Sequence, residues 1–246
     1  MNIRIDIEYD GEPYHGWQRQ GDLPTVQKVI EDCLQEITGE RVIVHGSGRT
    51  DSGVHAKNQV ACFYSDFRIP PERWSLALNT KLPFDIRVLG SCEVPHKFHA
   101  QRSAKWKTYE YRILNRSYAS ALDRRVYFWP HALDWDKMRL TLPYFVGTRD
   151  FRAFQSGPMT TKTTTRTIRR FEIVASEEVP GLYRFIVEGN GFLKQMVRNI
   201  VGTVMEVGQG LKPPEWVEEV FRSHCREFAG RAAPARGLYL VRVAYE

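Results

Sequence analysis

The sequence predicts an α+β protein made of two ferredoxin-like α/β subdomains, and two observations lead to this fold class. Segments with alternating apolar and polar residues, typical of half-buried strands, are interleaved with segments whose apolar residues recur every three or four positions, typical of amphipathic helices. The elements of the first half follow the order β-α-β-β-α-β of the ferredoxin-like unit, and the second half repeats this order. We therefore expect subdomains at 1–104 and 105–246 that share one continuous, mainly antiparallel sheet with a central active-site cleft.

The first half begins with a strand, because apolar residues alternate with charged ones from Ile3 to Tyr9. An amphipathic pattern then begins near Pro24 and Thr25 and stops at Gly39, which predicts a helix. The other elements predicted in this half are a strand at Arg41–Val44, a strand at Gln59–Tyr64, a helix at Pro71–Leu82 and a strand that begins at Ile86–Leu89.

The second half opens with a strand at Lys107–Leu114, in which Tyr109, Tyr111 and Ile113 share one face. A final strand at Gly237–Ala244 is apolar on both faces at its start, as expected of a central strand. Between them we predict a helix at Trp135–Phe145, a loop at Gly147–Phe154, strands at Thr165–Ala175 and Leu182–Gly189, a helix with an apolar stripe from Leu193 to Val204, and a short helix opened by Pro213 and Pro214.

Charge is unevenly distributed along the chain, which has 246 residues, 42% of them apolar, and a net charge of +6. Lys97–Arg116 contains six basic residues and one acid, and Thr160–Arg170 contains four basic residues and no acid. Basic segments that also carry aromatic residues are typical of proteins that bind polyanions such as RNA. A solubilising surface is the alternative, and charge excess considered by itself favours it.

The four cysteines show no CxxC spacing, and no secretory leader precedes them, so we expect reduced thiols in a cytoplasmic protein. No apolar run is long enough to span a bilayer, and we expect no membrane partner. Cys92, His96 and His99 form a close group, but it lacks the second half that a zinc site needs, and we expect no metal.

The stretch His45–Ala56, HGSGRTDSGVHA, is the candidate site for chemistry, because it combines three glycines with Arg49 and a single carboxylate, Asp51. The spacing of its glycines resembles a phosphate-binding P-loop, but Val54 and His55 replace the Lys and Ser or Thr of that motif. Asp-Ser-Gly also matches the short signature of aspartic proteases, whose chemistry needs two carboxylates that share a proton.

A neighbouring arginine lowers the pKa of an aspartate and so opposes proton sharing. A lone carboxylate kept ionised in this way suits a nucleophile or a general base. The alternative is that Arg49 and Asp51 only cap a turn, and the spacing by itself favours that alternative.

The sequence GRTDSGVHA at Gly48–Ala56 resembles the catalytic motif of the bacterial tRNA pseudouridine synthase A (TruA) family. Six further stretches resemble that family in the same order and extend the similarity over almost the whole chain. They are YHGWQRQ at Tyr14–Gln20, NTKLP at Asn79–Pro83, FHA at Phe98–Ala100, YEYRI at Tyr109–Ile113, MVRNIVGT at Met196–Thr203 and GLYLV at Gly237–Val241.

The resemblance implies an isomerase that converts uridine to pseudouridine at positions 38, 39 and 40 of the tRNA anticodon stem-loop. It implies that Asp51 is the essential catalytic residue, that Tyr109 stacks on the target uracil, that Arg198 pairs with Asp51, and that Arg49 helps to displace the target base. It also implies a homodimer that acts on the anticodon arm of tRNA, and a reaction without cofactor or metal. The family usually has Arg and an aromatic residue after FHA, whereas this chain has Gln101 and Arg102.

The residues considered without the resemblance favour simpler roles. Tyr109 then fits a core tyrosine of an alternating strand, and Arg198 a solvated arginine beside the apolar stripe of its helix. For His55, a bond to the backbone of its own loop competes with a contact to RNA. A non-catalytic RNA-binding or RNA-chaperone protein is the main alternative from another functional class, and it predicts tRNA binding without formation of pseudouridine.

Overall fold

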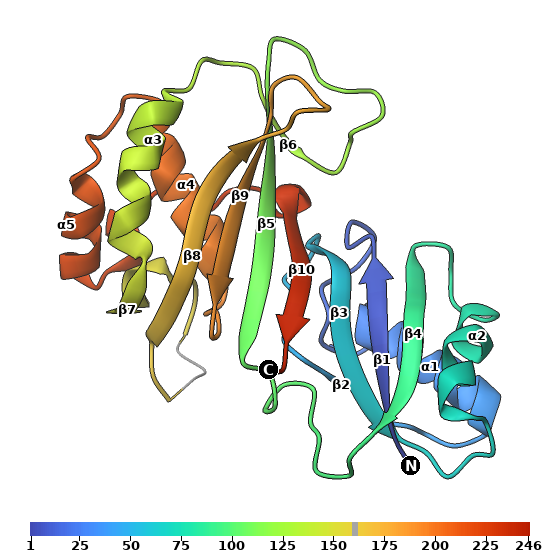
Figure 1. The fold of residues 1–246 in the computed structure, drawn as a ribbon. Helices are drawn as coiled ribbons and strands as arrows, with labels where there is room; N and C mark the ends of the chain where they lie inside the picture. The colour runs from blue at the N-terminus through green and yellow to red at the C-terminus, as the bar shows by residue number, and fades with distance from the viewer. Residues whose placement is uncertain (159–161) are drawn as a thin grey trace. The chain divides into compact units, whose positions relative to one another are not determined.

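The computed structural model describes residues 1–158 and 162–246, and the chain divides into two compact units, each with strands and helices (Figure 1). The first unit comprises Met1–Lys105 and Tyr239–Glu246, and the second comprises Trp106–Leu238. The predicted α+β class is confirmed. The C-terminal residues, which the sequence-based division grouped with the second half, belong to the first unit because their strand pairs there. The central cleft stays a prediction.

The first unit contains an antiparallel sheet in the order β4-β1-β3, with β1 at Asn2–Tyr9, β3 at His55–Tyr64 and β4 at Ile86–Val94. The edge of β3 that faces away from β1 pairs with two strands. Its C-terminal part pairs antiparallel with β2, the two-residue strand His45–Gly46, and its N-terminal part pairs parallel with β10, Leu238–Ala244. The chain order β1-α1-β2-β3-α2-β4 is the predicted ferredoxin-like connection.

Helix α1, Val26–Thr38 (Figure 1), has the predicted bounds. Its apolar stripe is buried. Thr25 caps its N-terminus by accepting a hydrogen bond from the Lys28 N–H at 3.4 Å. Gly39 ends the helix in the left-handed conformation, with φ at 76°. Burial of Val26, Ile30, Cys33 and Leu34 supplies the apolar contact that stabilises the helix in this unit.

The predicted helix at Pro71–Leu82 is shorter than the sequence indicated. It consists of the 3₁₀ turn η1, Pro71–Arg73, followed by α2, Trp74–Asn79. The Asn79 side chain explains the early end, because it donates to the Val88 carbonyl and accepts from the Val88 N–H, each at 2.9 Å. Asn79 thereby ties the end of α2 to strand β4.

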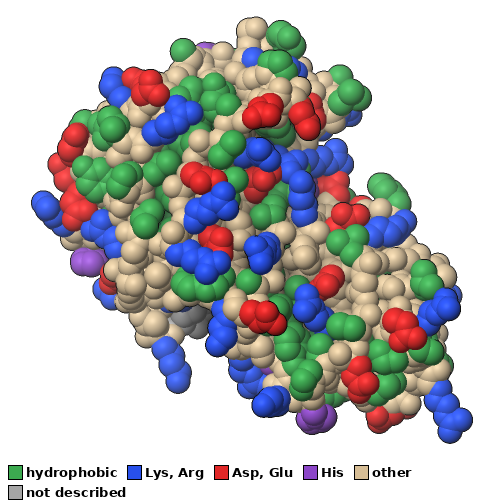
Figure 2. Space-filling view, viewed as in Figure 1, with side chains coloured by type: hydrophobic (Ala, Val, Ile, Leu, Met, Phe, Trp, Pro, Cys, Tyr) green, Lys and Arg blue, Asp and Glu red, His purple; other side chains and the backbone are tan. Residues whose placement is uncertain are grey.

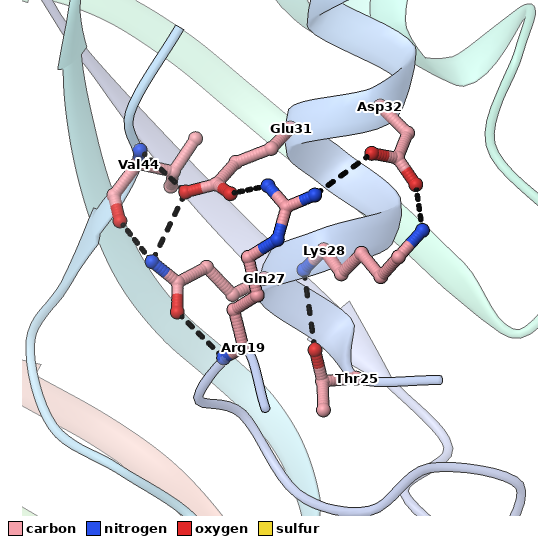
Figure 3. Close-up of polar contacts among 7 residues, drawn as sticks. All are labelled: Arg19, Thr25, Gln27, Lys28, Glu31, Asp32 and Val44. Carbon is pink, nitrogen blue, oxygen red and sulfur yellow. Dashed lines mark hydrogen bonds and ion pairs between the residues drawn. The ribbon is translucent and has the colours of Figure 1, made fainter. Parts of the chain in front are cut away.

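The strand predicted at Arg41–Val44 is wrong, because this segment is extended but pairs with no strand in the part of the chain that the structure describes. Side chains of α1 satisfy its backbone instead (Figure 3). Glu31 accepts from the Val44 N–H at 3.1 Å, and Gln27 donates to the Val44 carbonyl at 2.9 Å. Glu31 also accepts from Arg19 at 2.8 Å, so that one buried carboxylate joins two loop segments to α1.

The second unit is built on an antiparallel sheet in the order β5-β9-β8-β7 (Figure 1). Strands β8, Thr165–Ala175, and β9, Leu182–Gly189, have the predicted bounds, and β5, Trp106–Asn115, is one residue longer at each end than predicted. The first two residues of the basic segment Thr160–Arg170 lie outside the described residues.

Two short strands of this unit were not predicted. Strand β7, Gly147–Asp150, lies within the predicted loop Gly147–Phe154, whose end forms the 3₁₀ turn η3, Arg152–Phe154. Strand β6, Tyr127–Trp129, pairs parallel with the end of β5. Strands of three or four residues are too short to show a period in the sequence.

The helices of the second unit follow the sequence pattern with shifted bounds. The predicted helix at Trp135–Phe145 is α3, Trp135–Thr141, and then a 3₁₀ turn η2, Leu142–Phe145, because Pro143 cannot donate the next helical bond. Helix α4, Met196–Gly208, starts after Leu193, which the sequence had placed on its stripe. The remaining elements are α5, Trp216–Ser223, and the 3₁₀ turns η4, Arg226–Phe228, and η5, Ala235–Gly237.

Helices α3 and α4 are in close contact, since a Cβ at Gly208 of α4 would lie 2.3 Å from the sulfur of Met138 in α3. Among the described residues, every helix is too short or too polar to cross a membrane.

Candidate active site

Asp51 lies half-buried in a loop of the first unit, between β2 and β3. Strand β3 begins at His55, four residues before the predicted Gln59, so the irregular part of the loop is confined to 47–54. The Asp51 carbonyl accepts a hydrogen bond from the Val54 N–H at 3.1 Å, which closes a tight turn. Gly53 supplies the positive φ, 78°, that this turn requires.

A second segment, Gly11–Gln18, runs against this loop and clamps its backbone. The Trp17 N–H donates to the Thr50 carbonyl at 3.1 Å, and the Tyr14 carbonyl accepts from the Gly53 N–H at 3.3 Å. These backbone bonds replace the strand pairing that the loop lacks. We refer to Gly11–Gln18 as the clamp segment.

Two glycines of the clamp segment make this approach possible. A Cβ at Gly11 would lie 1.9 Å from the Val54 carbonyl oxygen. Gly16 has φ at +85°, and its Cβ would lie 2.6 Å from the Thr50 carbonyl oxygen. Both distances are too short for any larger residue unless the backbone moves, so the clamp segment packs closely against the Asp51 loop.

Buried hydroxyl and amide groups hold the remainder of the loop. The Tyr9 hydroxyl and Thr50 Oγ1 are 2.8 Å apart, and burial raises the pKa of Tyr9 to about 12. Gln59 accepts from the Ser47 hydroxyl at 2.6 Å and donates to the Gly48 carbonyl at 3.0 Å. Both sides of Asp51 are therefore tied to the first unit.

His55 and Arg49 differ in their surroundings. His55 is 2% exposed, and its Nδ1 accepts from the Gly11 N–H at 3.1 Å while the Asp10 carboxylate lies 2.9 Å from the same atom. Its ring stacks on Tyr239 with centroids 4.7 Å apart. Because His55 bonds to backbone in the buried interior, it belongs to the support of the loop. Arg49 is exposed, and its Nε donates to Gln18 Oε1 at 3.1 Å.

The two tyrosines of the YEYRI motif, which periodicity could not distinguish, have different environments in the second unit. Tyr111 is fully buried and donates its hydroxyl to the Pro234 carbonyl at 2.7 Å. Tyr109 is 6% exposed, and its ring meets the edge of Phe192 with centroids 5.0 Å apart. Tyr111 therefore has a structural contact for its polar end, and Tyr109 lies in an aromatic pair. Phe192 was missed because a lone aromatic in a loop carries no signal in the sequence.

Arg198 lies in the first turn of α4 and is half-buried. Its Nε donates to the Ala233 carbonyl at 2.7 Å, and the Ala233 N–H donates to the Arg198 carbonyl at 3.0 Å. We call residues 231–233 the strap. Gly202 permits the strap to run along α4, because a Cβ at Gly202 would lie 1.7 Å from the Arg231 carbonyl oxygen. The strap fixes the stem of Arg198. Asp51 and Arg198 belong to different units, and their pairing stays a prediction.

Many cations of the second unit's sheet lie beside carboxylates (Figure 2). Arg112 bonds to Glu110 at 2.6 Å on β5, and Arg169 pairs with Glu188 across the sheet. Lys107 differs, because burial and the nearby Arg166 lower its pKa to about 8. The basic segments therefore contain cations that are partly neutralised by neighbours as well as cations that repel each other.

The sequence grouped Cys92, His96 and His99 closely. Both histidines of this group contact aromatic rings. The ring of His96 lies 4.9 Å from that of Tyr64, and the ring of His99 lies 5.1 Å from that of His45. Within the described ranges, no three His, Cys, Asp or Glu side chains are grouped so that they could hold a metal ion.

The chain is similar to several known proteins. The family model described as tRNA pseudouridine synthase matches residues 6–101 and 142–246. Two similar relatives are both called tRNA pseudouridine synthase A: that of Acetivibrio thermocellus is 47% identical and that of Clostridium acetobutylicum 46% identical, each over 245 residues and 99% of both chains. Among solved structures, the chain is similar to one in the crystal structure of a Cbf5-Nop10-Gar1 complex, with 14% identity, a TM-score of 0.37, and coverage of 97% of this chain and 48% of that chain.

Proposed function

Since the chain belongs to the tRNA pseudouridine synthase A (TruA) family and is an isomerase that forms pseudouridine in tRNA, we propose that its targets are uridines 38, 39 and 40 of the anticodon stem-loop. The similarity of the motifs along the chain supports these positions. Bases in single-stranded loops and at their ends can be splayed out for recognition, which makes the anticodon arm a suitable substrate.

The observation that carries the catalytic assignment is the lone carboxylate of Asp51 in a loop that the clamp segment holds on both sides. In the reaction the N-glycosidic bond of uridine breaks, the uracil rotates, and a carbon–carbon bond forms between the base and C1′. The proton that leaves C5 is balanced by the one that N1 gains, so no co-reactant is consumed. Asp51 is the catalytic residue of this proposal, and attack on ribose C1′, attack on uracil C6 and proton abstraction from the sugar are the three chemistries open to it.

Three further residues complete the site in this proposal. Tyr109 stacks on the target uracil, Arg198 pairs with the Asp51 carboxylate, and Arg49 helps to displace the target base. The exposure of Arg49 supports its role, since a side chain that displaces a base must reach into the RNA. The strap at Ala233 supports the role of Arg198, because it fixes one end of the guanidinium stem.

Base flipping follows from the same assignment, because the reacting atoms of uridine are inaccessible while the base is stacked. Extrusion costs a few kcal/mol. Stacking on an aromatic residue returns about 1–3 kcal/mol per base, and contacts between basic segments and phosphates supply the remainder. We further propose that the enzyme works as a homodimer, as the family resemblance implies, and in the cytoplasm, as expected from its cysteines.

The decisive test uses Asp51→Asn and tRNA labelled with tritium at uridine C5. We expect the variant to release tritium at least about 10³-fold more slowly than the wild type, because the reacting carboxylate is lost, and to bind tRNA normally. Asp66→Asn is the matched control, since the Asp66 side chain is exposed in the same unit. Normal release by Asp51→Asn would contradict the proposal. Mapping of pseudouridine in the product by mass spectrometry would reveal whether positions 38, 39 and 40 are modified.

A further inference from the structure

The Tyr14 carbonyl contacts both residues that follow Asp51. It accepts a hydrogen bond from the Ser52 hydroxyl and one from the Gly53 N–H, each at 3.3 Å. These two residues are the central pair of the turn that Asp51 begins and Val54 closes. A displacement of the Tyr14 backbone would therefore be transmitted to the backbone that carries the Asp51 carboxylate.

The Tyr14 side chain is in turn held by Asp85. The Tyr14 hydroxyl donates to Asp85 Oδ1 at 2.6 Å, and the ring is 6% exposed. Burial and the Asp85 carboxylate raise the pKa of Tyr14 above its ordinary value, so the hydroxyl is a protonated donor at neutral pH. A short bond to an ionised acceptor is stronger than a neutral one.

Asp85 itself is anchored at the start of β4, next to Ile86. Its carbonyl accepts from the Asp10 N–H at 2.9 Å, which joins it to the residue just before the clamp segment. The other end of that segment is fixed to α1 through the Gln27 N–H, which donates to the Trp17 carbonyl at 3.0 Å, and just beyond it through Arg19 (Figure 3). The Tyr14–Asp85 bond is thus a side-chain tie at the residue of the segment that contacts Ser52 and Gly53.

We propose that Tyr14 and Asp85 are positioning residues for the isomerisation, which hold the Ser52–Gly53 turn and through it orient the Asp51 carboxylate. This inference rests on the proposed catalytic role of Asp51. Neither residue touches the reacting atoms. Their contribution belongs to the chemical step and not to tRNA affinity, because the phosphate and base contacts of the proposed function lie on other residues.

Tyr14→Phe removes the hydroxyl and keeps the ring, and Asp85→Ala removes the acceptor. We expect each variant to lower the single-turnover rate of pseudouridine formation about tenfold, since small displacements of a reacting group are costly, while the Kd for tRNA is unchanged. The double variant should be no slower than the slower single variant, because both substitutions break the same bond. Asp85→Asn keeps an oxygen acceptor and should recover part of the rate.

Tyr64→Phe is the matched control, because the Tyr64 hydroxyl donates to the His96 carbonyl at 2.6 Å in the same unit without touching the clamp segment. It should keep the wild-type rate. Wild-type rates in Tyr14→Phe and Asp85→Ala would overturn the inference, as would additive effects or a loss confined to tRNA affinity. An active Asp51→Asn variant would instead overturn the proposed function, so the two failures are distinguishable in one assay.

Discussion

The residues proposed for catalysis in the two units are positioned by different physical means. Asp51 lies in an irregular loop, where close backbone approach at Gly11 and Gly16 replaces the regular bonds of a sheet. Tyr109 and Arg198 lie on a strand and a helix, where the ladder and the helical bonds already fix the backbone. The position of the Asp51 loop therefore depends on glycines, which have no side chain. On the strand and the helix the backbone position is already fixed, and function depends on which side chain is present.

Among the substitutions that test this difference, Gly16→Ala has the largest expected effect on activity. The new methyl would lie 2.6 Å from the Thr50 carbonyl oxygen, so the loop that carries Asp51 must shift. We expect a loss of about 100-fold in kcat and a destabilisation of roughly 1–3 kcal/mol. Activity assays and urea denaturation measure the two effects.

Gly39→Ala is the control for backbone strain alone. Gly39 has φ at +76°, close to that of Gly16, but a Cβ there has nothing within 4 Å. It should lose about 1 kcal/mol of stability and keep full activity. Equal losses of kcat in the two variants would mean that the close approach at Gly16 does not position the loop.

A comparable or smaller loss of activity is expected at Tyr109, where activity should depend on the aromatic ring. Tyr109→Ala should lower kcat/KM by roughly 5- to 150-fold, the equivalent of about 1–3 kcal/mol of base stacking. Tyr109→Phe keeps a stacking ring and should retain most activity. The measurement is kcat/KM on the same tRNA.

Tyr111→Phe is the internal comparison on the same strand. It removes the bond to the Pro234 carbonyl and should cost about 1–2 kcal/mol of stability with little change in kcat/KM, because Tyr111 is fully buried. If Tyr111→Phe lost activity and Tyr109→Ala did not, the two tyrosines would have to exchange roles.

The last effect appears only at high pH and concerns the stability contributed by Tyr9, whose hydroxyl bonds to Thr50 of the loop. Burial raises the pKa of Tyr9 from 10.0 to about 12, so the unfolded chain loses this proton first. The stability that the neutral hydroxyl contributes is present below pH 10 and is lost as the pH rises through 12. The difference in unfolding free energy between wild type and Tyr9→Phe should fall by up to about 3 kcal/mol over this window. A pH-independent difference in urea denaturation would contradict this linkage.

Long periodic segments could be predicted from the sequence because their period is a property of the chain itself. The bounds of α1, β8 and β9 follow from alternation, helical spacing and the stop at Gly39. The segment Arg41–Val44 has the same strand-like composition, yet Glu31 and Gln27 satisfy the Val44 backbone instead of a strand. Partners that are distant in sequence decided that case.

For the proposed site, the sequence by itself predicted which residues carry out the chemistry. The loop with its single carboxylate and the motifs that resemble a known family are short local patterns that can be identified without a structure. Only the tertiary structure decided how the Asp51 loop is held, that His55 supports it from the buried interior, and that the Tyr111 hydroxyl donates to the Pro234 carbonyl. The physical reason is that burial and close backbone approach arise between segments far apart in the chain, and no local pattern records them.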